Sequence, residues 1–292
     1  MSKFEDKVII TAALSGVLAT RDQCPHIPYT ALEIALEAQR AYDAGAACVH
    51  IHARTDEGAP SWELETFRTI KDETRKRCPV ILNFSTGTMD DDTSAQETII
   101  RELRPEIAAL NMGTMNYAKY SAKRKAFVFD MVFPNTFGKI ERMLSAMNDA
   151  GVKPELECFD AGHTNSIWPL YDMGKLKKPT QFSFIMGVLG GLPTSIEAMQ
   201  LQRQTIPPDA TWEVIGIGKE QWRLLASSLV LGGNIRVGLE DNFYVSPGVM
   251  AGSNGELVEK AVRMVRDQGR EVATVEQCRE RLPVPGVRAR RS

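Results

Sequence analysis

Two histidines, His50 and His52, stand two residues apart in the apolar run 48–54. Residues at this spacing point to the same face of an extended strand, so the two imidazoles would lie side by side. Imidazole is the commonest metal-binding side chain, although a lone histidine on an apolar face is more often an ordinary core residue. The pair therefore predicts half of a metal site, and the rest of the chain must supply another ligand.

A candidate for the missing ligand is Glu240, at the end of the apolar run 234–240. If this run is a strand, Glu240 shares a face with Arg236. Two histidines and one glutamate are a common ligand set for catalytic Zn²⁺, which is favoured, while Mn²⁺ and Fe²⁺ accept the same side chains. A structural ion pair between Arg236 and Glu240 inside the protein is the alternative.

Asp241 follows Glu240 directly and would point to the other face of an ideal strand. The pleat often breaks at a strand end, so Asp241 could still face the site. There it would suit a general base, because the charge of Arg236 would keep it ionised. A loop or helix-capping aspartate is the alternative reading of this position.

Further polar residues stand at or near the ends of other apolar runs: Asn83, Ser85, Asn111, Thr114, Glu155, Glu157 and Asp160. The segment Ser85-Thr86-Gly87 can donate hydroxyl and backbone hydrogen bonds to an anion, and so can the glycine-rich run 187–191, although either can be an ordinary turn. Neither G-x-x-x-x-G-K-[ST] nor G-x-G-x-x-G occurs, which excludes nucleotide phosphate loops of those two kinds.

The runs that carry these residues alternate with helical patterns along the chain. Strands are expected over residues 7–14, 48–54, 80–86, 107–114, 155–160, 181–188, 212–217 and 234–240, and helices over residues 31–44, 63–77, 94–103, 136–150, 164–173, 195–204, 221–231 and 255–268. Eight such units predict an α/β fold, a (β/α)₈ TIM barrel formed by residues 1–292 as a single domain. An open doubly wound sheet is the structural alternative. In a barrel the polar residues at the strand ends would meet around one active site.

Composition narrows the possible partners. The chain has 292 residues, an ordinary apolar fraction of 43% and a formal net charge of −2, so nothing favours nucleic acid or a membrane surface, and small molecules or copies of the chain itself are expected. No apolar run approaches the roughly 18 residues that cross a bilayer, and the first residues lack the order of a signal peptide, so a cytoplasmic protein is expected. The five scattered cysteines predict buried, reduced thiols, and the basic stretch 288–292 a solvated end.

Taken together, these residues give the chain a resemblance to the β-keto acid cleavage enzymes. The resemblance covers nearly the whole chain and is carried by residues 10–13 with Gly16, and by residues 49–52, 85–87, 110–116, 154–157, 187–191, 216–218 and 235–242. Its most specific parts are the His-x-His pair and the Arg-x-x-x-Glu-Asp-Asn segment in their proper order.

The resemblance implies a Zn²⁺-dependent barrel that condenses a β-keto acid with acetyl-CoA and releases acetoacetate and a new acyl-CoA, working as a homotetramer. It implies that the metal, held by His50, His52 and Glu240, is chelated by the carboxylate and keto oxygen of the substrate and stabilises the enolate. It further implies these roles: Asp241 as the base, Arg236 and Ser85 assisting it, Glu157 orienting Arg236, and Thr114, Asn111, Thr86, Gly87 and Leu18 around the substrate.

Leu18 is the position at which the chain departs from the family member that acts on a 5-amino substrate, which has a glutamate there. A leucine cannot neutralise an ammonium group, so an uncharged, aliphatic side chain is expected on the β-keto acid. Two other readings stay open: a metal-dependent aldolase or isomerase of another TIM-barrel family, which would not consume CoA, and a metal- or ligand-binding barrel without catalysis.

Overall fold

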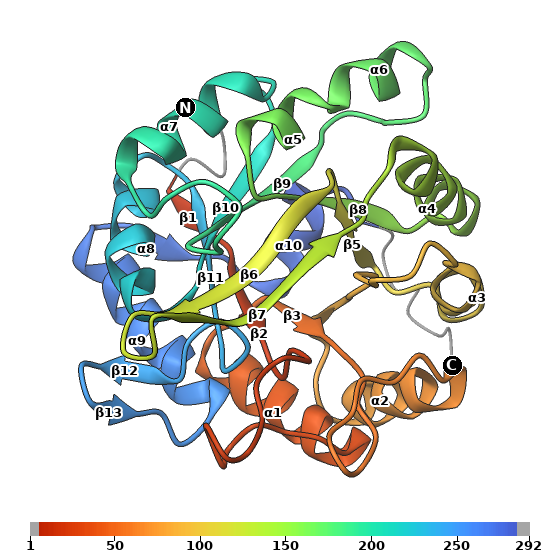
Figure 1. Cartoon of the computed structure of the whole chain (residues 1–292). Coiled ribbons are helices and arrows are strands. Elements are labelled where there is room, and N and C mark those ends of the chain that lie inside the picture. Colours follow the sequence, from red (N-terminus) through yellow and green to blue (C-terminus); the bar gives the residue numbers. More distant parts are fainter. Residues whose placement is uncertain (1–5, 285–292) are drawn as a thin grey trace.

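The computed structural model describes residues 6–284 and shows eight parallel strands closed into a barrel (Figure 1). The strands follow one another around the barrel in the order β10, β11, β2, β3, β4, β5, β8 and β9. Their bounds are β2 Ile10–Ala13, β3 Cys48–Ile51, β4 Ile81–Phe84, β5 Ile107–Asn111, β8 Lys153–Cys158, β9 Gln181–Met186, β10 Thr211–Gly216 and β11 Asn234–Val237. The TIM-barrel prediction is confirmed, and closure of β11 onto β2 excludes the open sheet.

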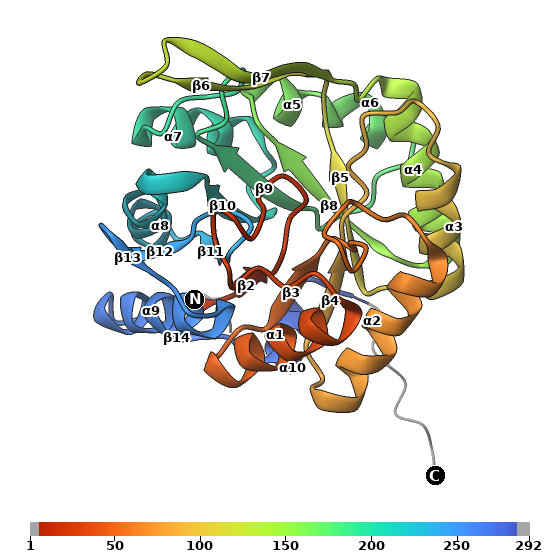
Figure 2. The same ribbon diagram turned by 60° about the horizontal axis from the view of Figure 1, so that its bottom comes forward.

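Helices surround this barrel, as Figure 2 shows from a second side. Their bounds are α1 Ala31–Ala44, α2 Leu64–Arg77, α3 Ser94–Leu103, α4 Phe137–Ala150, α5 Ala161–Asn165, α6 Ile167–Asp172, α7 Ile196–Thr205, α8 Gln221–Val230 and α9 Asn254–Asp267. The single helix expected over residues 164–173 is two short helices, α5 and α6. The chain starts α1 with a capping box between Thr30 and Glu33, and ends it at Gly45 with φ +118°.

Several elements were not expected from the sequence. The helix α10 (Val275–Arg281) and the short strand β14 (Glu271–Val272) lie near the end of the described chain, and β14 pairs in parallel with β1 (Lys7–Val8), the separate first part of the strand expected over residues 7–14. Two antiparallel hairpins follow barrel strands: β6 (Met115–Ser121) with β7 (Ala126–Phe133), and β12 (Tyr244–Ser246) with β13 (Val249–Met250). The first of these crosses the front of the barrel in Figure 1 and runs along its upper edge in Figure 2.

Several strands are shorter than expected, which changes how two site residues are held. β3 ends at Ile51, so His52 already belongs to the following loop, and β11 ends at Val237, so Glu240 does not share a strand face with Arg236. Gly238 explains the second difference. It has φ +142°, and a Cβ there would lie 2.0 Å from the backbone oxygen of Ala13, so the chain leaves the strand at a glycine.

Most of the buried apolar residues form one large core between the barrel and its helices, to which Ile10, Val49, Leu82 and Val214 belong. The five cysteines are free and buried, as predicted. Among residues 6–284, none of the helices combines the length and the apolar character that a membrane span requires. The expectations for the first five residues and for the basic stretch 288–292 fall outside the described part of the chain.

Candidate active site

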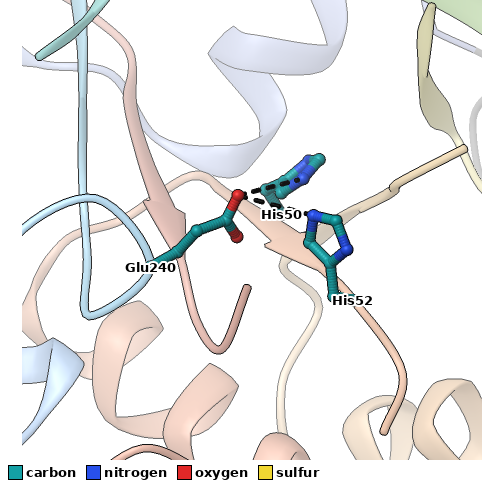
Figure 3. A group of neighbouring side chains, drawn as sticks. All are labelled: His50, His52 and Glu240. Atoms are coloured by element: carbon teal, nitrogen blue, oxygen red, sulfur yellow. Dashed lines mark ion pairs between the residues drawn. The ribbon is translucent and has the colours of Figure 1, made fainter. Parts of the chain in front are cut away.

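The side chains of His50, His52 and Glu240 converge at the carboxyl-terminal mouth of the barrel (Figure 3). One oxygen of Glu240, Oε1, lies 3.8 Å from Nε2 of His50 and 3.4 Å from Nε2 of His52. The two imidazole centroids are 5.1 Å apart and the rings are inclined by 71°. The ligand atoms that the three residues offer all lie within 4.8 Å of one another, although they come from segments almost 190 positions apart.

The donor set suits a divalent cation such as Zn²⁺. Burial, and then the charge of Arg236, keep the pKa of His50 well below its usual value. Burial alone would raise the pKa of Glu240, but Arg236 and the two histidines hold it well below its usual range. A neutral imidazole and an ionised carboxylate are the forms that bind a metal. Among residues 6–284, Oε2 of Glu240 also has no hydrogen-bond partner although it is buried, which leaves it available to a ligand.

Gly16 gives Glu240 the room to reach this position. It has φ +54°, and a Cβ on it would lie 2.7 Å from Cγ of Glu240. The loop that contains Gly16 is held by Arg54, a buried guanidinium that donates hydrogen bonds to the carbonyl oxygens of Ser15, Gly16, Ala19 and Gly58. No sequence pattern indicates this role of Arg54, because its hydrogen-bond partners are backbone atoms.

Arg236 lies beside the three residues and is paired with carboxylates on several sides. Its Nε and Nη2 donate to the two oxygens of Asp241, each at 2.9 Å, and Nη2 also donates to Oε1 of Glu240 at 2.7 Å. Oε1 of Glu157 is 3.6 Å from Nη1. The expected ion pair between Arg236 and Glu240 therefore exists alongside the cluster with the histidines, and the two readings do not exclude each other.

The two other carboxylates of this group sit in different electrostatic surroundings from Glu240. Burial raises the pKa of Asp241 to about 6, although Arg236 acts to lower it. Burial and the neighbouring Glu155 raise the pKa of Glu157 to about 8, again against Arg236. The pKa of Asp241 thus lies close to neutral pH, which is the range in which a general base works well.

The segment that follows β4 contributes Ser85, Thr86 and Gly87 to the same mouth. The backbone N–H of Gly87 donates to Oγ of Ser85 at 3.4 Å, which leaves the hydroxyl proton of Ser85 free for another acceptor. The hydroxyl of Thr86 instead donates to the carbonyl of Ala109.

Asn111, Thr114 and Leu18 lie around the same mouth. Asn111 is buried at the end of β5, and its Oδ1 has no hydrogen-bond partner within the described chain. Thr114 is exposed, and its Oγ1 accepts from the backbone of Asn135 at 2.8 Å. Leu18 is 53% exposed and lies in the loop that Arg54 holds, two residues after Gly16.

Sequence reasoning missed Tyr117, which the hairpin β6–β7 brings to the site. Burial, followed by the charges of Glu240 and Asp241, raises the pKa of Tyr117 to about 12. Its ring stacks on Phe129 and meets Phe133 edge to face, both with centroids 5.9 Å away. Recognising the alternation of aromatic and polar residues over 115–133 as a hairpin would have pointed to this residue.

A family model and several related proteins point to the same protein family. A family model described as beta-keto acid cleavage enzyme matches residues 7–284. The chain is 39% identical to the 3-keto-5-aminohexanoate cleavage enzyme of Fusobacterium nucleatum, over 95% of this chain and 98% of that protein. It is 32% identical to the 3,5-dioxohexanoate:acetyl-CoA acetone transferase of Paraburkholderia graminis, over 96% of each chain. It is 31% identical to the 3-oxoadipate:acetyl-CoA acetyltransferase of Cupriavidus necator, over 96% of this chain and 95% of that protein.

Among solved structures, the apo form of ObcA superimposes with a TM-score of 0.73 at 21% identity, over 89% of this chain and 66% of ObcA. At this identity the likeness concerns the fold, and it agrees with the closed barrel described above.

Proposed function

The chain belongs to the family of β-keto acid cleavage enzymes, and from this premise we propose that it transfers an acyl group to CoA from a β-keto acid with an uncharged side chain. The keto acid R–CO–CH₂–COO⁻ and acetyl-CoA would give R–CO–CoA and acetoacetate. One carbon–carbon bond breaks in the keto acid and an equivalent bond forms in acetoacetate, while the thioester bond of acetyl-CoA breaks and that of the new acyl-CoA forms, so the atoms balance without a further reactant. Relatives named as acetyl-CoA transferases support acetyl-CoA as the co-substrate.

The observation that carries this proposal is the convergence of His50, His52 and Glu240 next to the pair of Arg236 and Asp241. We assign the first three residues to a Zn²⁺ ion, with Mn²⁺ and Fe²⁺ as less favoured occupants. When bound, such an ion would act as a Lewis acid toward the two oxygens of a β-keto acid. The ligand atoms within 4.8 Å and the unpartnered oxygen of Glu240 support the assignment.

Asp241 is proposed as the base that removes a proton from the carbon between the two carbonyl groups of the substrate. Arg236 donates to both oxygens of Asp241 and fixes the plane of the carboxylate, while a carboxylate keeps lone pairs beyond the two that accept from Arg236. Glu157 stands on another side of the guanidinium and helps to orient it. Ser85 has a free hydroxyl proton with which it would donate to an oxygen of the substrate.

We propose that Asn111, Thr86, Gly87 and Thr114 line the substrate pocket opposite the loop of Leu18. An apolar side chain at position 18, in a loop fixed by Arg54, offers no counter-charge to an ammonium group. The substrate side chain is therefore proposed to be uncharged and aliphatic, unlike that of the 3-keto-5-aminohexanoate cleavage enzymes.

The decisive experiment combines metal analysis of the purified protein with an assay of several β-keto acids and acetyl-CoA, followed by mass spectrometry of the acyl-CoA products. Bound Zn²⁺ and an acyl-CoA whose acyl group comes from a keto acid with an uncharged side chain are the expected results. Carbon–carbon cleavage or isomerisation with no change in the CoA thioester would favour the metal-dependent aldolase or isomerase instead. A clear preference for the 5-amino substrate would overturn the proposed side-chain class.

We further propose that residues 1–292 form one domain and that it works in the cytoplasm. We also propose that it assembles as a homotetramer, which is what the resemblance implies. The described residues contain a single closed barrel, which supports the first point. Light scattering of the purified chain would measure the mass of the assembly, and a monomeric mass would contradict the tetramer.

A further inference from the structure

His50 has a neighbour on the next strand, Asn83, whose side-chain oxygen could accept a hydrogen bond from its imidazole. His50 of β3 and Asn83 of β4 are register partners in the parallel ladder, and their side chains are 1% and 0% exposed. Nδ1 of His50 and Oδ1 of Asn83 are both buried, and neither has a hydrogen-bond partner among residues 6–284. One of these atoms can carry a proton and the other can only accept one.

The orientation of the Asn83 amide follows from its other neighbour. Nδ2 of Asn83 donates to Oε2 of Glu155, a residue of β8 with no exposed surface. A carboxylate oxygen accepts hydrogen bonds, so the amide nitrogen must face Glu155, and flipping the amide would place two acceptors against each other. Oδ1 of Asn83 is therefore available to a donor on another side, and the imidazole of His50, on the neighbouring strand, can provide one.

Glu155 is itself held by a buried polar layer that crosses the interior of the barrel. Oγ of Ser183, on β9, donates to Oε1 of Glu155 and lies 3.2 Å from Oε1 of Glu213, on β10. Oγ1 of Thr11, on β2, donates to the second oxygen of Glu213 at 2.8 Å. These residues are all at most 3% exposed. A network of this kind fixes its members, because each would lose a buried hydrogen bond by turning away.

We propose that Asn83 is the positioning residue of His50: its Oδ1 accepts the proton on Nδ1, selects that tautomer and leaves Nε2 unprotonated toward Glu240. Glu155 acts one step further back by holding the amide of Asn83. A histidine that ligates a metal generally donates its other ring N–H to a carbonyl or carboxylate, and the amide of Asn83 provides this partner from within the barrel. Only the consequence for metal affinity rests on the proposed function, since the tautomer is a property of the protein alone.

The tautomer is measured directly by ¹⁵N NMR of the imidazole nitrogens in chelator-treated protein. The chain has four histidines, so the spectrum contains few signals, and His52 serves as an internal reference. The proposal predicts Nδ1–H in the unmodified protein and a mixture of tautomers in Asn83→Leu, with His52 unchanged. Thr11→Val, which removes a hydrogen bond from the far side of the same layer, should leave the signals of His50 in place. If Asn83→Leu keeps the tautomer of the unmodified protein, the proposal is wrong.

A double variant that exchanges the amide and the carboxylate between positions 83 and 155 keeps the test valid if Asn83→Leu fails to fold. In the double variant Asn83→Asp, Glu155→Gln, a carboxylate at position 83 can accept from His50 and from the new amide at position 155, so the Nδ1–H tautomer should return. In the single variant Asn83→Asp two carboxylates would face each other, which is expected to cost stability. A double variant that folds and shows the Nε2–H tautomer would overturn the proposal.

Metal affinity gives the second readout. Competition with a chromophoric chelator should show Zn²⁺ binding weakened by about 10- to 100-fold in Asn83→Leu, and restored in the double variant, whereas Thr11→Val keeps the affinity of the unmodified protein. If the unmodified protein binds no metal, the proposed function fails while the NMR result still decides the role of Asn83. Unchanged affinity in Asn83→Leu, together with an unchanged tautomer, would contradict that role.

Discussion

The two ends of the barrel are built from the same eight strands but bury different kinds of side chain. At the amino-terminal end, Ile9, Ile81 and Ile107 pack against Val275 and further apolar residues in and beside α10, in a cluster that also contains Cys48, Cys278 and Leu282. At the carboxyl-terminal end the barrel buries an arginine, carboxylates and imidazoles. Apolar burial stabilises, whereas buried charges are costly unless they are paired. One end of the barrel therefore contributes mainly to stability, and the other end carries the residues of the proposed active site.

Removing a proposed metal ligand should have the largest effect. His50→Ala is expected to fold, to lose bound Zn²⁺ and to lose turnover entirely, because two side chains would remain where three are needed. Metal analysis and the acyl-CoA assay measure the two losses. His26→Ala, at an exposed histidine, is the matched control and should change neither. An active His50→Ala protein with its metal retained would contradict the site.

Asp241→Asn should lower turnover by about 10²- to 10⁴-fold, the range for loss of a general base, while metal binding persists. The substitution keeps the size of the side chain, so binding of Zn²⁺ and loss of turnover are expected to separate. Asp130→Asn, at an exposed position of β7, is the control. Unchanged turnover in Asp241→Asn would remove the base assignment and leave the metal assignment standing.

At the opposite end, Leu282→Ala should affect stability alone. Leu282 is 2% exposed, and deleting a buried leucine side chain to alanine costs about 2–5 kcal/mol in the free energy of unfolding. Denaturant unfolding measures this loss, and Leu201→Ala, at a leucine that is 46% exposed, should cost much less. A fall in turnover per folded molecule of Leu282→Ala would show that the two ends are not as separate as the comparison suggests.

The smallest effect is expected at Leu18. Two substrates are compared by their kcat/KM: a β-keto acid with an ammonium group in its side chain and one with an uncharged side chain. Leu18→Glu should raise the ratio of the first to the second by at most about 5-fold, since a partly exposed ion pair contributes up to about 1 kcal/mol. Leu18→Gln has a similar size without the charge and should not produce this shift. If the ratio of the two kcat/KM values is the same in Leu18→Glu and Leu18→Gln, the charge at position 18 does not determine which substrate is preferred.

The sequence was sufficient to predict the barrel, because eight apolar runs alternate with helical patterns and each strand is buried on both faces. The proximity of His50, His52 and Glu240 could also be predicted, because the carboxyl ends of parallel strands meet at one mouth of the barrel. The sequence did not predict where the strands end. An apolar pattern reports burial, whereas β11 ends because Gly238 turns the backbone against Ala13.

Other features depend on contacts between distant segments. The pairing of His50 with Asn83 depends on the register between β3 and β4, which no local pattern specifies. The hairpin β6–β7 occupies residues between the strand expected over 107–114 and the helix expected over 136–150, where no element was expected, so Tyr117 was missed. The helix α10 is too short to show a clear apolar pattern in the sequence, and its apolar residues are recognised only by the strand ends that they cover.

The most direct test of the proposed reaction follows acyl-CoA formation from acetyl-CoA and a β-keto acid with an uncharged side chain in chelator-treated protein, before and after addition of Zn²⁺. The expected result is no acyl-CoA before the addition and full recovery after it, with acetoacetate formed in equal amount. Full turnover by protein that contains no metal, or cleavage of the keto acid without a new acyl-CoA, would contradict it.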